Sequence, residues 1–169
     1  KKFLNGKNFY RKLQLLEGMT MVDIFKLANS EGIVDDVQGD LFLLQKKLGV
    51  RYLYEGFLFP DTFYYQKGDL FSSLLQRSFL KQQKLYSELW TSRQDGLPYQ
   101  SLKEAITLAS IIEKEGLEKK LIAGVFVNRL KKNMKLQSDP TVIYAMGNSF
   151  DGNIRKADLR IDNPYNTYK

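Results

Sequence analysis

The longest regular pattern in the sequence is helical and runs from Leu70 to Trp90. Its apolar residues recur every three or four positions, with basic and amide residues between them, as in a helix that packs one face against a core. They are Leu74, Leu75, Phe79, Leu85, Tyr86 and Leu89. The segment Asp95-Gly96-Leu97-Pro98 then breaks the pattern. We therefore expect one long packing helix, followed by a separate set of elements.

The residues before this helix predict a strand, a turn and further helices. Residues 9–16 alternate loosely between apolar and polar, and residues 21–27 carry apolar side chains at helical spacing. Thr20 is the predicted N-cap of the first helix, with Asp23 completing a weak capping box. A second short helix is predicted from Gly39 to Leu48.

An aromatic stretch from Tyr52 to Tyr65 lies between these elements and the long helix. Gly56 and Pro60 interrupt it. It also contains two acids, Glu55 and Asp61, which the folding of such a stretch does not require. We expect a loop or a short strand that lines a binding site.

Three more helices are predicted after the break. Ser101 and Glu104 form a Ser-x-x-Glu capping box that opens a helix over residues 102–117, and a further apolar helix covers residues 121–130. A third helix begins with Asp139 as its N-cap and proline at its first position. The predicted fold class is therefore α+β, with a mainly helical second part and short strands.

Composition limits the chemistry available to the chain. Its 169 residues are 43% hydrophobic, which is enough for one domain or one domain with a small satellite. Cysteine and histidine are both absent, so disulfides, thiolate metal sites, Ser-His-Asp hydrolysis and most zinc chemistry are excluded. Catalysis would depend on carboxylates, and we expect no metal and no other cofactor. The net charge of +7 fits nucleic acid, a phospholipid surface or a carboxylated polymer as partner.

One acidic residue, Glu113, falls on the apolar side of the predicted helix over residues 102–117. On a wheel of about 100° per residue it lies between apolar residues of the preceding and the following turn. A carboxylate that faces the interior is costly unless it is paired, hydrogen-bonded or protonated, and partial burial favours the neutral form that a general acid needs. The structural alternative is a salt bridge to Arg129 or Lys114 without a catalytic role. Glu115, in contrast, is predicted on the solvated face.

A polar segment follows the helix over residues 121–130. Gln137, Asp139, Thr141 and Tyr144 lie around Pro140. These side chains suit the hydroxyls and amides of sugars. They also fit an ordinary capped helix start, and the two interpretations are compatible.

Four blocks of sequence, taken together, match one enzyme family in order and spacing over most of the chain. The blocks are Glu55-Gly56-Phe57-Leu58-Phe59-Pro60-Asp61-Thr62, then Ala109-Ser110-Ile111-Ile112-Glu113-Lys114-Glu115, then Val127-Asn128-Arg129-Leu130 with Leu136-Gln137-Ser138-Asp139-Pro140-Thr141-Val142-Ile143-Tyr144, and Pro164-Tyr165-Asn166-Thr167-Tyr168. With these blocks the sequence closely resembles the endolytic murein transglycosylases of the YceG-like family.

The resemblance implies a site as well as an activity. It assigns the catalytic glutamate to Glu113, the residue that the helical wheel also indicates. The matching blocks imply a set of substrate-binding residues: Glu55, Asp61, Asn128, Arg129, Gln137, Asp139, Thr141, Tyr144, Tyr165 and Asn166. The implied activity is cleavage of the bond from N-acetylmuramic acid to N-acetylglucosamine in nascent peptidoglycan, with 1,6-anhydro ends, which limits the length of the glycan strands.

The resemblance also implies an organisation and a location. Residues 1–50 are expected to form a small LysM-like α/β subdomain that is incomplete at its start, and residues 51–169 the catalytic domain without its C-terminal part. The family implies a single-pass protein of the inner (cytoplasmic) membrane, anchored outside this segment, with its catalytic domain in the periplasm or outside the cell. Peptidoglycan glycan strands are the expected partner, together with penicillin-binding proteins and other wall-synthesis proteins.

Three alternatives differ from this interpretation. A muramidase would need Asp139, Asp61 or Glu55 as a second carboxylate. A non-catalytic scaffold that binds peptidoglycan within the wall-synthesis complex would need no acid on an apolar face. A nucleic-acid binder is supported only by the net charge and the tyrosines, because the basic residues are spread along the chain, and no nucleic-acid partner is expected.

Overall fold

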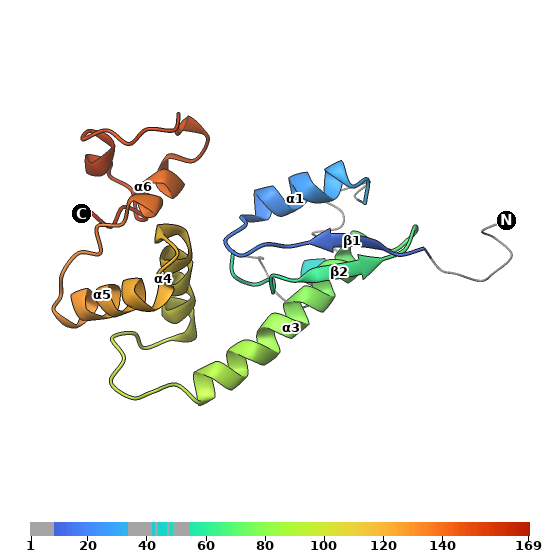
Figure 1. The fold of residues 1–169 in the computed structure, drawn as a ribbon, viewed down its shortest axis with the longest axis horizontal. Coiled ribbons are helices and arrows are strands. Elements are labelled where there is room, and N and C mark those ends of the chain that lie inside the picture. Colours follow the sequence, from blue (N-terminus) through green and yellow to red (C-terminus); the bar gives the residue numbers. More distant parts are fainter. Residues whose placement is uncertain (1–8, 34–41, 43, 47, 49–54) are drawn as a thin grey trace, which may run out of the picture. The chain divides into compact units, whose positions relative to one another are not determined.

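The structure, a computed structural model, describes residues 9–33, 42, 44–46, 48 and 55–169. The chain forms two compact units, Lys1–Ser92 and Arg93–Lys169, whose elements are shown in Figure 1. The domain boundary that the sequence predicts between residues 50 and 51 lies outside the described residues.

The first unit contains a two-stranded antiparallel sheet. β1 (Arg11–Gln14) pairs with β2 (Thr62–Tyr65), and the register places Leu13 opposite Phe63. Alternate strand residues point to opposite faces, so Phe63 and Tyr65 are buried while Tyr64 is 60% exposed. Both strands lie where the sequence predicts extended chain. Their pairing joins residues that are far apart in sequence.

Helix α1 (Met21–Ser30) begins with the predicted capping box. The Asp23 amide donates a hydrogen bond to Thr20 Oγ1 at 3.2 Å, and the Thr20 amide donates to Asp23 Oδ2 at 2.9 Å. The helix buries Ile24 and Ala28 against the sheet residues. Of the predicted second helix, residues 42, 44–46 and 48 are helical, and the rest lies outside the described residues.

The predicted long helix is confirmed as α3 (Phe71–Thr91). Its first turns join the core of the first unit through Phe71, Leu74 and Leu75, where Phe71 meets Phe25 of α1 edge-to-face at 5.8 Å. Its C-terminal part is more open, and Leu89 is 57% exposed. The apolar pattern therefore predicts the helix correctly but extends its packing face too far.

Residues 93–169, all of which the structure describes, form helices and loops without a strand. The helices are α4 (Leu102–Glu115), α5 (Lys119–Lys131), α6 (Asp139–Met146), η2 (Gly147–Ser149) and η3 (Asp158–Arg160). Each of the three longer helices buries one large apolar side chain, namely Leu108, Phe126 and Val142. α4 contacts both α5 and α6. No helix formed by the described residues is long and apolar enough to cross a membrane.

Two details of the predicted helix starts differ from the structure. Ser101 caps α4 by accepting from the Glu104 amide at 3.2 Å, but the Glu104 carboxylate accepts from the Gln100 amide at 2.8 Å rather than from Ser101. Asp139 is not the N-cap of α6, because the helix already includes it and Ser138 takes that position. The side chain of Ser138 forms no capping bond, since its hydroxyl has another partner.

Candidate active site

Glu113 lies in the last turn of α4 and pairs with a lysine at the start of α5. Lys119 Nζ is 3.0 Å from Glu113 Oε1, and it also donates a hydrogen bond to the main-chain carbonyl of Glu113 at 2.5 Å. Both side chains are 37% exposed. The site thus holds a carboxylate that solvent can reach and whose direction is fixed by a cation.

Glu113 is more exposed than the prediction of an interior-facing side chain implies. The wheel assumes that packing continues along the whole helix, but α4 ends at Gly116 and its last turn is only partly covered. The predicted salt-bridge partners were also wrong. The partner is Lys119, while the Arg129 guanidinium donates to the main-chain carbonyl of Leu136.

Glu115 has a structural partner that the sequence pattern did not indicate. Ser138 is completely buried, and its hydroxyl donates to Glu115 Oε2 at 2.5 Å. A buried hydroxyl without a partner would be costly, and a carboxylate is a strong acceptor for it. Glu115 is exposed, as predicted, and one of its carboxylate oxygens also accepts a hydrogen bond from this buried hydroxyl.

The C-terminal segment closes around the same serine. The Ser138 amide donates to Thr167 Oγ1 at 2.9 Å, and the Thr167 hydroxyl is also 2.9 Å from Thr141 Oγ1. Thr141 in turn donates to the Ser138 carbonyl at 2.7 Å. The Gln137 amide donates to the Thr167 carbonyl at 3.1 Å and holds Gln137 at a φ of +52°, which is uncommon for a residue other than glycine. Hydroxyl groups thus join the start of α6 to residues 166–168.

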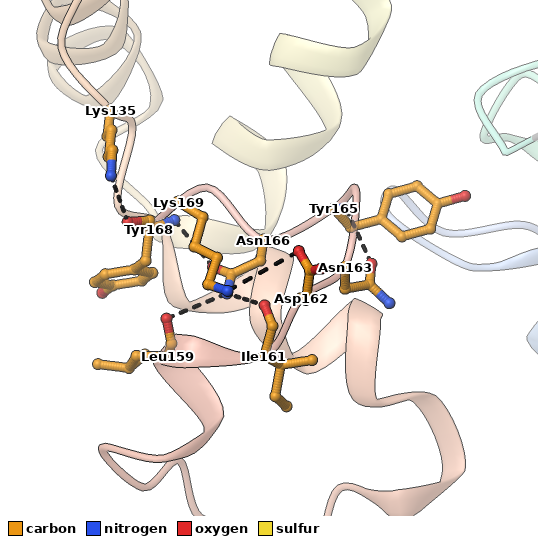
Figure 2. Close-up of polar contacts among 9 residues, drawn as sticks. All are labelled: Lys135, Leu159, Ile161, Asp162, Asn163, Tyr165, Asn166, Tyr168 and Lys169. Carbon is orange, nitrogen blue, oxygen red and sulfur yellow. Dashed lines mark hydrogen bonds and ion pairs between the residues drawn. The ribbon is translucent and has the colours of Figure 1, made fainter.

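Tyr168 extends this network to Asp139. Its hydroxyl donates to Asp139 Oδ1 at 2.5 Å, and its main-chain carbonyl accepts from Lys135 Nζ at 3.2 Å, a bond drawn in Figure 2. The hydrogen bond to Asp139, helped by partial burial, raises the pKa of Tyr168 to about 12. Tyrosinate beside a carboxylate is unfavourable, so this hydroxyl stays protonated and keeps donating.

Asn166 joins the C-terminal segment to residues 159–161 through hydrogen bonds of its side chain. Its side-chain amide donates to the carbonyls of Ile161 at 2.8 Å and Leu159 at 3.2 Å, as Figure 2 shows. Its own Oδ1 accepts from the Tyr168 amide at 2.9 Å. Asn166 is 6% exposed, so the structure places this predicted substrate-binding residue, like Thr141, inside the unit with its polar atoms bonded to the protein.

Two other predicted residues form an aromatic pair on the surface. The rings of Tyr144 and Tyr165 meet edge-to-face with centroids 4.8 Å apart. They are 45% and 55% exposed, and in Figure 2 the Tyr165 ring points away from the other labelled side chains. Asn128 and Gln137 are also exposed.

Glu55 and Asp61 belong to the first unit, apart from the unit that carries Glu113. Asp61 pairs with Lys81 at 2.5 Å and accepts from the Thr62 amide at 2.7 Å. The bond from Lys81 is the main cause that lowers the pKa of Asp61. Glu55 is exposed.

The sequence prediction missed four residues of the second unit that organise the site. They are Lys119, Ser138, Thr167 and Tyr168. Ser138, Thr167 and Tyr168 lie within the matching sequence blocks, one or two positions from a predicted residue, and Lys119 follows Glu113 at the start of the next helix. These four residues belong to no sequence motif that predicts a hydrogen-bond partner, so their partners are known only from the fold.

The arrangement suits proton transfer by a single carboxylate. Glu113 is accessible and oriented, as a general acid and base must be. The second unit also carries exposed amides and aromatic rings, on Asn128, Gln137, Tyr144 and Tyr165, and such groups can bind neutral sugars.

Comparisons with known proteins identify the relatives of this chain. A sequence model of the YceG-like family matches residues 1–169. The chain is 41% identical over 138 residues to the endolytic murein transglycosylase of Bacillus subtilis (strain 168), a match that covers 80% of this chain and 37% of that protein. It is 34% identical over 175 residues to the protein of the same name from Streptococcus pneumoniae serotype 2 (strain D39), covering 90% of this chain and 31% of that protein. The chain thus spans about a third of the length of these curated relatives.

A solved structure has the same fold. The crystal structure of a YceG-like protein from Listeria monocytogenes superposes with a TM-score of 0.63 and 30% identity, over 94% of this chain and 59% of that one. The family match extends over the whole chain and includes every block that carries the predicted site. The chain belongs to the YceG-like family.

Proposed function

We propose that this protein is an endolytic lytic transglycosylase that cleaves peptidoglycan glycan strands, with Glu113 as its catalytic acid and base. The names of its relatives support the activity. The observation that carries the assignment to Glu113 is its placement as an accessible carboxylate held by Lys119 at 3.0 Å, within the second block of the family pattern.

The proposed mechanism uses the glutamate twice. Protonated Glu113 donates to the glycosidic oxygen between N-acetylmuramic acid and N-acetylglucosamine. As carboxylate it then takes the proton of the muramyl 6-hydroxyl, which attacks the anomeric carbon and closes a 1,6-anhydro ring. No water is consumed. Lys119, whose ammonium lies 3.0 Å from Glu113 Oε1, holds the carboxyl group in position for both steps.

The substrate-binding residues remain part of this proposal. Exposed Asn128, Gln137 and the Tyr144–Tyr165 pair are the candidates for direct contact with sugars. Buried Thr141 and Asn166 act instead by holding the C-terminal segment in place. Glu55 and Asp61 remain proposed as substrate-binding residues of the first unit by itself, and the proposal includes a LysM-like fold for residues 1–50.

We further propose that the protein is held at the inner membrane by a single anchor outside this segment, with the catalytic domain on the outer side. There it would meet nascent strands and work beside penicillin-binding proteins and other wall-synthesis proteins, limiting strand length. These proposals rest on family membership.

A muramidase would require a second carboxylate free to activate water. Two of the three candidates are engaged elsewhere, Asp139 with Tyr168 and Asp61 with Lys81. This favours the mechanism with a single carboxylate.

Glu113→Gln tests the assignment. The amide keeps the shape of the side chain but cannot transfer the proton, so we expect cleavage of uncrosslinked glycan strands to fall by roughly 10²–10⁴-fold with an unchanged melting temperature. Glu118→Gln is the matched control, because Glu118 is exposed and its side chain forms no capping bond. Wild-type cleavage by folded Glu113→Gln would contradict the proposal.

A further inference from the structure

The end of α4 lacks the usual closing geometry of a helix. Gly116 is fully extended, with φ 171° and ψ −172°, and not left-handed as the glycine at a helix end commonly is. The last carbonyls of a helix need partners from outside it. For Glu113 that partner is the ammonium of Lys119. The turn that carries the catalytic residue therefore depends on side-chain anchors.

Glu113 and Glu115 provide these anchors on opposite sides of the helix. Residues two positions apart are about 200° apart around a helix. On one side Glu113 is held by Lys119 of α5, and on the other Glu115 is held by Ser138 before α6. Contacts with two different elements prevent the last turn from rotating.

The second anchor is the more deeply buried one. Ser138 has no exposed surface, and its amide and carbonyl are bonded to Thr167 and Thr141. Its hydroxyl has the Glu115 carboxylate as its acceptor, at 2.5 Å. The position of Glu115 is thus set by a buried network that connects α6 to the C-terminal segment.

We propose that Glu115 is a positioning residue, which through Ser138 fixes the direction of the Glu113 carboxylate. This inference rests on the proposed function. Glu115 itself transfers no proton. To hold Ser138, the side chain at position 115 needs a hydrogen-bond acceptor but no charge, because the Ser138 donor is a neutral hydroxyl.

The test measures kcat and KM on uncrosslinked glycan strands. Glu115→Ala and Ser138→Ala should each lower kcat about ten- to a hundredfold, as a displaced catalytic group does, with KM changed less than about twofold. The double variant should be no slower than the slower single variant, because both break the same bond. Glu115→Gln should restore most of the rate, since its amide oxygen can accept from Ser138. Glu118→Ala is the control and should match the wild type.

Hydrogen exchange supplies a readout that does not need cleavage. The amides of residues 112–117 should exchange faster in Glu115→Ala and Ser138→Ala than in the wild type, Glu115→Gln or Glu118→Ala. Circular dichroism confirms that each variant is folded.

Several results would overturn the inference. Glu115→Gln as slow as Glu115→Ala would mean that the charge takes part in the chemistry. Wild-type kcat, or unchanged exchange, in Ser138→Ala would mean that the anchor is not needed. A wild type that cleaves no strands refutes the proposed function instead, and the exchange rates then still decide whether the anchor exists.

Discussion

Lys119 binds both ends of one residue: its ammonium lies 3.0 Å from the Glu113 carboxylate and 2.5 Å from the Glu113 carbonyl oxygen. The first contact orients the side chain, and the second supplies a partner for the end of α4. α4 and α5 are thereby joined at the residue proposed to transfer protons. The sequence pattern does not predict the contact between Lys119 and Glu113, because the loop between the helices brings the lysine back onto the last turn of α4.

Lys119→Met should lower the cleavage rate about fivefold while changing the free energy of unfolding by less than about 1 kcal/mol. A partly exposed ion pair contributes no more than about 1 kcal/mol to stability. The same free energy, lost from the transition state, lowers a rate about fivefold. Lys119→Arg should recover part of the rate. Lys120→Met, at the exposed neighbouring position, serves as control. Equal rates for Lys119→Met and Lys120→Met would show that the pair does not orient the carboxylate.

The second prediction concerns alkaline pH. The pKa of Tyr168 is raised to about 12 mainly by its bond to Asp139. A pKa that is higher in the folded state gives stability that is fully present below the ordinary value of about 10 and lost as pH rises through 12. Between pH 10 and 12 the wild type should therefore lose more stability than Tyr168→Phe, measured by urea unfolding. Parallel curves for the two proteins would contradict the hydrogen bond.

Asn166→Ala should destabilise the second unit by about 1–3 kcal/mol. The substitution leaves the carbonyls of Leu159 and Ile161 without this donor and the Tyr168 amide without its acceptor, and it removes a side chain that is 6% exposed. Asn148→Ala, at an exposed position, should change stability by less than about 0.5 kcal/mol. Denaturant titration compares the two, and equal stabilities would refute the anchoring role of Asn166.

Much of the local structure could be predicted from the sequence because it depends on local chemistry. The capping box of Thr20 and Asp23 and the helix over residues 71–91 follow from spacing and residue type alone. The pairing of β1 with β2 could not be predicted in this way, because pairing between distant strands leaves no local pattern.

The candidate site shows the same limit. A wheel identifies Glu113 as unusual, but it treats the helix as if both ends were equally covered, so it overstates the burial of a residue in the last turn. It places Glu115 correctly on the exposed side of the helix. It cannot show that one carboxylate oxygen accepts from a buried hydroxyl 23 positions away in the sequence.

The mass of the product tests the central claim most directly. If the 6-hydroxyl of the substrate is the nucleophile, uncrosslinked strands digested in heavy-oxygen water should show internal cuts that leave 1,6-anhydromuramic ends without the label, and Glu113→Gln should give none of them. Free reducing ends that carry the heavy oxygen, one water heavier than the anhydro form, would contradict the account. They would identify a hydrolase and require a second carboxylate among Asp139, Asp61 and Glu55.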